Sequence, residues 1–156
     1  MAEQAENFWG GHEFCWACRV LDGVSPGFVV TQDEVVAVLI NPFPLSPGHS
    51  LIVPRRHIEN IYALPEVVAG PILSTAARVA RAAKRAFAAD GVTLRQNNDA
   101  ASDQHLFHFH LHVVPRFTGD GDRFNAQPRQ ISIGEQQFSA DRLREGLAHS
   151  TKKETI

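Results

Sequence analysis

Several features that would place this chain in a specialised class are missing from it. The 156 residues include only two cysteines, Cys15 and Cys18, so a framework of structural disulfides is not expected. No run of about 18 apolar residues occurs, so no membrane span is expected. The N-terminus lacks the charged-then-apolar order of a signal peptide, which favours a cytoplasmic location. A formal net charge of −2 is not typical of a basic nucleic-acid coat.

The sequence also lacks the common phosphate-binding loops. There is no GxxxxGK[ST] motif, and TGDGD at residues 118–122 has the glycines but not a strand-to-helix context. Any nucleotide must therefore be held in another way. With 44% hydrophobic residues, the chain is expected to form one soluble domain with a real core. We predict a flexible arm over residues 1–12, the domain over 13–117, and a C-terminal extension with a loop and a short helix over 118–156.

The pattern of apolar residues predicts an α+β fold. Runs rich in β-branched residues predict strands, and these are residues 28–31, 35–40, 50–54, 92–96 and 106–114. The alanine-rich stretch 65–89 has apolar residues at helical spacing and predicts a long helix, in which Gly70-Pro71 marks a kink or the true start. Ser139 is expected to cap a short helix that runs through Leu147. This order favours a mainly antiparallel sheet.

The segment HFHLHVV, residues 108–114, has a histidine at every second position. Side chains alternate across a strand, so His108, His110 and His112 are expected on one face and the apolar residues between them on the core face. A generic polar face seldom has imidazole at all three positions, since this group titrates near neutral pH. Two chemical interpretations remain, a metal site built from HxH pairs and nucleophilic catalysis by imidazole.

The residues around this segment favour catalysis on a phosphate-containing substrate. Within residues 95–105, RQNNDAASDQH, the neutral donors suit phosphate or ribose oxygens without adding a fixed charge, and they are Gln96, Asn97, Asn98, Ser102 and Gln104. Pro47-Gly48-His49 adds a further imidazole from the edge of a different strand.

The segment 108–114 resembles the signature of the histidine triad (HIT) superfamily: His, apolar, His, apolar, His and two apolar residues. Residues 41–57, Gln96–Asn98 and Pro115-Arg116 are also similar to stretches of this family, so the resemblance covers roughly residues 14–116. It implies an α+β domain with a five-stranded, mainly antiparallel sheet, one long helix and short flanking helices. It also implies a homodimer and hydrolysis or transfer at the α-phosphate of a nucleotide.

The resemblance implies a role for each matched residue. His110 would attack phosphorus and form a nucleotidyl-histidine intermediate, and His112 would donate to the phosphoryl oxygens or the leaving group. His108 and His49 would orient His110 through hydrogen bonds. The expected substrate-binding residues are Asn41 at the ribose and Asn97, Gln104 and His105 near the phosphates. No catalytic cofactor is expected for this reaction.

Two positions depart from the family's pattern. Asp103 replaces a loop glycine, and we expect it to point away from an anionic substrate. His105 stands where the family often has a hydroxyl residue. It is either a donor to the leaving group or an exposed loop residue.

The motif Cys15-Trp16-Ala17-Cys18 leaves three interpretations open. A redox motif would follow a strand inside a βαβ unit, which this segment lacks. Two buried thiols in an apolar segment are the second interpretation. The third is structural zinc, because some bacterial HIT proteins with a similar CxxC bind zinc with two histidines. That resemblance implies His57 and His108 as the partners of Cys15 and Cys18, which completes the four ligands of tetrahedral zinc.

The sequence therefore predicts a cytoplasmic nucleotide hydrolase or transferase that acts on adenosine 5′-phosphate derivatives, such as dinucleoside polyphosphates or phosphoramidates. One rival is a nucleotide-binding regulatory protein with little turnover. Another is a metalloenzyme that uses the triad as ligands. Neither a membrane nor a nucleic acid is expected as a partner, since no basic or zinc-finger extension follows the domain.

Overall fold

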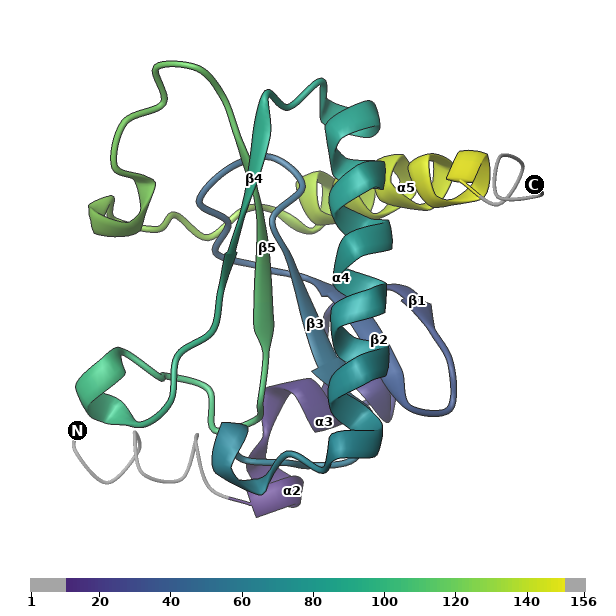
Figure 1. The fold of residues 1–156 in the computed structure, drawn as a ribbon, viewed down its shortest axis with the longest axis vertical. Coiled ribbons are helices and arrows are strands. Elements are labelled where there is room, and N and C mark those ends of the chain that lie inside the picture. Colours follow the sequence, from purple (N-terminus) through teal and green to yellow (C-terminus); the bar gives the residue numbers. More distant parts are fainter. Residues whose placement is uncertain (1–10, 151–156) are drawn as a thin grey trace.

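Residues 11–150 are described by the computed structural model of this chain. Five strands form a single sheet of order β1-β2-β3-β5-β4, in which all neighbouring strands are antiparallel (Figure 1). The strands are β1 (Val29–Gln32), β2 (Val36–Ile40), β3 (Ser50–Pro54), β4 (Gly91–Arg95) and β5 (Leu111–Arg116). The predicted α+β class is confirmed. No helix among the described residues is long and apolar enough to cross a membrane.

Helices precede, connect and follow these strands. They are α2 (Gly11–Phe14), α3 (Trp16–Leu21), η1 (Ile61–Ala63), α4 (Glu66–Phe87), η2 (Ala100–Ser102), η3 (Arg123–Asn125) and α5 (Ile133–Ser150). The long helix predicted over residues 65–89 is α4. Of the predicted arm over residues 1–12, the last two residues belong to α2, and residues 1–10 lie outside the described residues.

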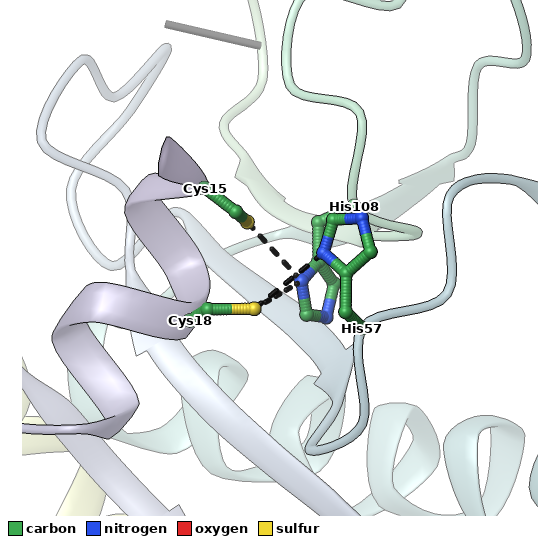
Figure 2. A group of neighbouring side chains, drawn as sticks. All are labelled: Cys15, Cys18, His57 and His108. Carbon is green, nitrogen blue, oxygen red and sulfur yellow. Dashed lines mark hydrogen bonds between the residues drawn. The ribbon is translucent and has the colours of Figure 1, made fainter. Parts of the chain in front are cut away.

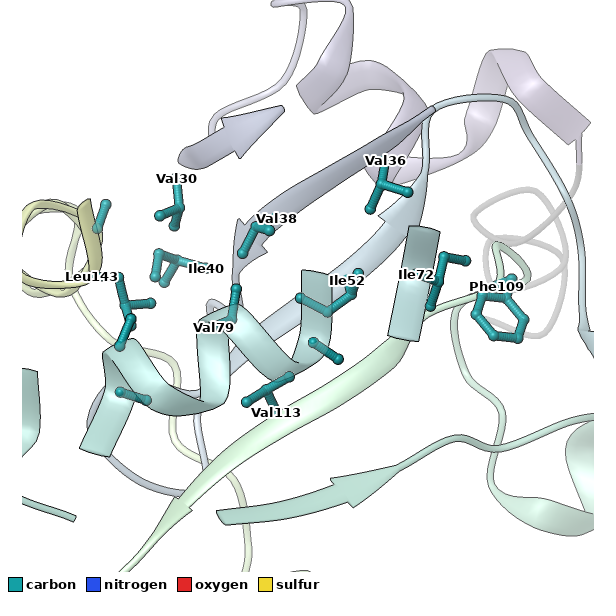
Figure 3. Close-up of a cluster of buried hydrophobic side chains, with 14 of the residues drawn as sticks. Val30, Val36, Val38, Ile40, Ile52, Ile72, Val79, Phe109, Val113 and Leu143 are labelled. Atoms are coloured by element: carbon teal, nitrogen blue, oxygen red, sulfur yellow. The ribbon is translucent and has the colours of Figure 1, made fainter. Parts of the chain in front are cut away.

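The main core lies between one face of the sheet and the helices α4 and α5 (Figures 1 and 3). Val38 of β2, Ile52 of β3 and Val79 of α4 are fully buried in it, and Leu143 of α5 joins the same cluster. Burial of each such side chain contributes about 1.5–3 kcal/mol. Phe109 also belongs to this cluster, which confirms that apolar residues between the histidines face the core.

The opposite face of the sheet has a smaller apolar cluster beneath α3. Leu39 of β2 and Leu51 of β3 pack there with Cys15 and Cys18, all of them buried. The period-two alternation along β2 and β3 divides each strand between the two clusters. The short helix α3 is therefore fixed to the sheet face that also has the triad.

Helix α4 begins before the Gly70-Pro71 pair, which was expected to kink it or to mark its start. Its first residue is Glu66, and Pro71 lies in the second turn. A proline at this place removes one hydrogen bond near the helix end, which the packing of Ile72, Thr75 and Val79 offsets.

Helix α5 is longer than predicted, and Ser139 does not cap it. The helix begins at Ile133, and Ser139 is a buried residue of its interior. At its start, the backbone N–H of Ser132 donates to Oε2 of Glu135 at 2.8 Å, and the N–H of Glu135 donates to Oγ of Ser132 at 3.2 Å. The S-x-x-E signal of this capping box was present in the sequence and was missed.

Strand β5 is shorter than the strand predicted over residues 106–114. It begins at Leu111, because β3 pairs with it only from Ser50 to Ile52 and β4 ends opposite His112. Residues before it are held by other contacts, such as the bond from the N–H of Phe109 to the carbonyl oxygen of Ile58 at 2.6 Å. Alternating polarity alone did not show where the partner strands end.

Gly48, directly before His49, requires the absence of a side chain. Its φ is +82°, and a Cβ there would lie 2.4 Å from the ring of Phe87. We expect Gly48→Ala to lower the free energy of unfolding by roughly 2–4 kcal/mol, through backbone strain and overpacking. Urea denaturation measures this loss. Gly23→Ala is the control, because Gly23 has φ +73° with nothing within 4 Å, and it should cost only about 1–2 kcal/mol. Equal losses of unfolding free energy in the two variants would show that the contact with Phe87 does not contribute to the effect.

Candidate functional site

Three of the predicted catalytic histidines line one cavity of about 350 Å³. His49 directly precedes β3, His110 directly precedes β5, and His112 is the second residue of β5. The other lining residues are Trp16, Asn41, Pro42, Phe43, Leu45, Leu51, Asp103, His105, Leu106 and Pro128. Most of these walls are apolar, and the imidazoles supply a few convergent polar groups, which is typical of a small-molecule site.

One hydrogen bond decides which ring nitrogen of His110 is free. Its Nδ1 lies 2.7 Å from the backbone carbonyl oxygen of His108. Because a carbonyl only accepts, Nδ1 has the proton and donates it, and Nε2 of the neutral ring keeps its lone pair. The residue is only 6% exposed, and its ring centroid lies 4.8 Å from that of His112. His110 thus has the protonation state that a nucleophilic imidazole requires.

A second chain of hydrogen bonds determines the proton positions of His49 and His112. The backbone N–H of Leu45 donates to Nδ1 of His49 at 3.0 Å, so the proton of the neutral His49 ring is on Nε2. That Nε2 lies 2.9 Å from Nδ1 of His112 and donates to it. Neutral His112 therefore has its proton on Nε2. His112 is thus a hydrogen-bond donor whose ring centroid lies 4.8 Å from that of His110.

Burial keeps these imidazoles neutral. Burial, together with a smaller effect of repulsion by His110, lowers the pKa of His49 to about 3 and the pKa of His112 to about 2. The pKa of His110 is also lowered, chiefly by burial, although its bond to the His108 carbonyl opposes the shift. A pocket of neutral imidazoles at physiological pH follows from this environment.

These shifted pKa values predict a loss of stability in mild acid. An unfolded histidine binds its proton near pH 6.5, whereas folded His49 and His112 bind theirs only near pH 3 and 2. Unfolding therefore takes up protons throughout this window, and each histidine lowers the free energy of unfolding by roughly 2 kcal/mol between pH 6.5 and 5. Denaturation midpoints across this range measure the slope. A His49→Gln/His112→Gln double variant should flatten it, and the same slope in both proteins would contradict this origin.

Asn41 and His105, two of the four predicted substrate-binding residues, line the cavity. Oδ1 of Asn41 accepts the backbone N–H of Phe43 at 2.9 Å, and its Nδ2 lies 3.3 Å from Nε2 of His49. His105 is exposed at the edge of the cavity. Both expectations for His105, donor or loop residue, are therefore compatible with its position.

Gln104 and Asn97 do not line the cavity and instead brace the loop before the triad. Nε2 of buried Gln104 donates to the carbonyl oxygens of Glu59 and Leu106, and its Oε1 accepts the N–H of Asp99 at 2.7 Å. Oδ1 of Asn97 accepts Nε of Arg95 at 3.0 Å. A direct role at the phosphates stays a prediction for these two residues.

Asp103 was expected to point away from an anionic substrate. It lines the cavity, and its carboxylate lies 3.7 Å from the guanidinium of Arg95. Its φ of +61° is a left-handed conformation that favours glycine. The ion pair neutralises a negative charge that would otherwise oppose an anionic substrate.

The four predicted metal ligands converge at a second place, behind the triad (Figure 2). The Sγ of Cys15 lies 3.3 Å from Nδ1 of His108, and the Sγ of Cys18 lies 3.5 Å from Nδ1 of both His57 and His108. Ligand atoms around tetrahedral zinc are separated by about 3.3–3.8 Å, given Zn–S near 2.3 Å and Zn–N near 2.0 Å. All four ligand atoms lie within 4.8 Å of one another. The residues fit a zinc ion in identity, number and spacing.

The surroundings of this cluster also suit a dication. Nε2 of His108 donates to the carbonyl oxygen of Pro54 at 2.8 Å, so its Nδ1 is unprotonated and directed at the thiols. Burial raises the pKa of the Cys18 thiol to about 12, and the neighbouring Cys15 adds to this. The buried thiol of Cys18 stays protonated unless a cation compensates the charge of its thiolate.

Two parts of the site were not specified from the sequence. Pro128 of the C-terminal segment lines the cavity. The carbonyl of Pro54 orients His108. No sequence signal marks a backbone carbonyl or a loop proline as part of a site, because their placement depends on the tertiary fold.

Fold and site together define a class of protein: an antiparallel α+β domain with an alternating His-x-His-x-His segment at an apolar cavity. The model of the HIT domain matches residues 22–119, which is more than half of the chain. The chain belongs to the HIT family.

Named relatives and solved structures support this assignment. The chain is 33% identical over 102 residues to adenylylsulfatase HINT3 of Arabidopsis thaliana, which covers 65% of this chain and 52% of that protein. A hypothetical histidine triad nucleotide-binding protein of Sulfolobus tokodaii superposes with a TM-score of 0.82 at 28% identity, covering 90% of this chain and 96% of that one. A Zn-bound histidine triad family protein of Mycobacterium smegmatis superposes with a TM-score of 0.80 at 30% identity, covering 92% of this chain and 100% of that one.

Proposed function

We propose that this protein is a nucleotide hydrolase or transferase that acts at the α-phosphate of adenosine 5′-phosphate derivatives. The observation that carries the proposal is the protonation state of the triad: in the same cavity, His110 has an unprotonated Nε2 and His112 has an Nε2–H donor. The named adenylylsulfatase among the relatives supports an adenylyl group as the transferred part. Dinucleoside polyphosphates, phosphoramidates and adenylyl sulfate are the substrates to test.

The reaction would run in two displacements. Nε2 of His110 attacks the α-phosphorus, the bond from phosphorus to the leaving group breaks, and the leaving group takes the electron pair, with a hydrogen bond from Nε2–H of His112 and, where it needs one, a proton from solvent. Water then attacks phosphorus, the P–N bond returns its electrons to His110, and the proton of water is released to solvent. The products are AMP and the free leaving group. His49 positions His112 throughout.

Rapid quenching with substrate labelled in the adenylyl group tests this proposal. Label on the denatured protein at early times, followed by release of AMP in the presence of chelator, is the expected result. The rival is a regulatory protein that binds nucleotide with little turnover. Tight binding of the same substrates without AMP release would favour the rival and overturn the enzymatic proposal.

We also propose that Cys15, Cys18, His57 and His108 hold a structural zinc ion. The fit of their spacing supports this, as does the Zn-bound relative of similar fold. A bound zinc would supply charge compensation for the thiolates and a cross-link between α3 and the triad segment. Metal analysis tests it: one zinc per chain is expected in the wild type and none in Cys15→Ser/Cys18→Ser, while His149→Ala should keep the metal. Equal zinc in all three proteins would contradict these ligands.

A homodimer and a cytoplasmic location remain proposals drawn from the family. Among the described residues, one feature supports the dimer: β4 is an edge strand of the sheet, and its Leu94 is 44% exposed. We expect light scattering to give twice the chain mass for the wild type. Leu94→Lys should shift the protein toward the monomer, because a charge at an apolar subunit contact is costly. Thr93→Lys on the opposite side of the same strand is the control, and equal shifts would argue against a contact through Leu94.

A further inference from the structure

A row of side chains crosses the sheet at the level of the triad. In the strand registers, Leu51 of β3 is opposite His112, and Arg95 of β4 is opposite His112 on its other side. Directly opposed residues of neighbouring strands project to the same face. The row therefore runs from an apolar residue that lines the cavity, through the imidazole, to a guanidinium.

Contacts with Asn97 and Phe124 hold Arg95 in this place. Its Nε donates to Oδ1 of Asn97 at 3.0 Å, and its guanidinium carbon lies 4.9 Å from the ring centroid of Phe124. Phe124 belongs to η3 in the C-terminal segment. Stacking on an aromatic ring and a hydrogen bond at Nε orient the group while leaving terminal N–H donors for another partner. Arg95 also acts on the triad, since its charge contributes to the lowered pKa of His112.

A carboxylate already occupies the position where an anion would meet Arg95. Asp103 lies 3.7 Å from a terminal nitrogen of Arg95, lines the cavity, and has a side chain that is 74% exposed. An exposed ion pair of this length stabilises the protein by little, so a substrate oxyanion can displace it. Sulfate and phosphate groups match a guanidinium better than a single, loosely paired carboxylate does.

We propose that Arg95 is a specificity residue that selects substrates whose leaving group is an oxyanion, either sulfate or a phosphate chain. The nucleoside would lie over the apolar side of the row, the α-phosphate at the imidazoles, and the leaving group toward β4, where Arg95 binds it in place of Asp103. This inference rests on the proposed function and adds the leaving-group class to it. In the first displacement the P–O bond breaks, and the oxyanion keeps the electron pair while Arg95 compensates its growing charge.

Binding measurements on a catalytically inactive background test this inference independently of catalysis. In a His110→Ala background, the affinities for adenosine 5′-phosphosulfate and adenosine 5′-phosphoramidate are compared with and without Arg95→Gln by calorimetry. We expect Arg95→Gln to weaken binding of the phosphosulfate by about tenfold or more and binding of the phosphoramidate by less than about twofold. Asp103→Asn should strengthen the phosphosulfate severalfold, because it removes the competing carboxylate. Arg116→Gln is the matched control, since Arg116 contacts the same Phe124 ring but is paired with Asp120 at 2.7 Å.

The outcomes distinguish the two proposals. Equal losses for both nucleotides, or equal effects of Arg95→Gln and Arg116→Gln, overturn the inference. If selective binding is seen but the wild type releases no AMP, Arg95 is a specificity residue and the enzymatic proposal fails. If the His110→Ala protein binds neither nucleotide, the nucleotide site is misplaced and both proposals fail. In a turning-over wild type, the same selectivity should appear in kcat/KM.

Discussion

Replacing His110 with alanine should lower the rate of AMP release by at least about 10,000-fold, because the nucleophile of both displacements is lost. Nucleotide affinity should change by less than about threefold, since the apolar walls of the cavity and the donor at His112 remain. Steady-state AMP release and equilibrium binding, measured on the same preparation, provide the two numbers. A loss of nucleotide binding as well as turnover would mean that the nucleotide site is misplaced.

The control for this experiment is His149→Ala. His149 is an exposed residue of α5 whose Nδ1 bonds the carbonyl oxygen of Glu145, far along the chain from the triad. Its activity should equal that of the wild type. If His110→Ala keeps more than about one hundredth of the wild-type rate, a nucleotidyl-histidine intermediate on this residue is excluded.

Removal of the proposed zinc should produce the second large effect. At free zinc about a thousandfold above the dissociation constant, binding alone adds about 4 kcal/mol to the free energy of unfolding. Cys15→Ser/Cys18→Ser, or a chelator, should therefore lower the unfolding midpoint and free the segment around α3. Thermal unfolding of the wild type with and without chelator measures this, and added zinc should restore the midpoint.

The double serine variant provides the specificity control. It keeps the shape of the thiols but not the ligand chemistry, so chelator and added zinc should leave its midpoint unchanged. A chelator effect of the same size in wild type and variant would place the metal elsewhere. Loss of zinc should also reduce AMP release, because His108 connects the two sites. Its imidazole belongs to the proposed zinc ligands, and its backbone carbonyl oxygen accepts the hydrogen bond from Nδ1 of His110.

Much of the fold was predictable because its signals are local. The β-branched apolar runs of β2 and β3, and the helical spacing of Ile72, Ala76 and Val79 in α4, are such signals. The start of α5 was missed although Ser132 and Glu135 form a capping-box sequence that predicts it. The start of the triad strand was placed too early for a different reason, since it depends on where the partner strands stop.

The sequence by itself determined which chemical groups are available: three alternating imidazoles and a CxxC with histidine partners. The apolar residues between the imidazoles determined that the imidazoles lie on the face opposite the core. Only the tertiary structure decided how that chemistry is set. A backbone carbonyl determines the proton position of His110, and a backbone N–H acting through His49 determines that of His112. The fold also brings Cys15 and Cys18 to His108, from which they are separated by 93 and 90 positions in the sequence. It also placed Arg95 beside His112. Such pairings depend on strand register and burial, which no short window of sequence specifies.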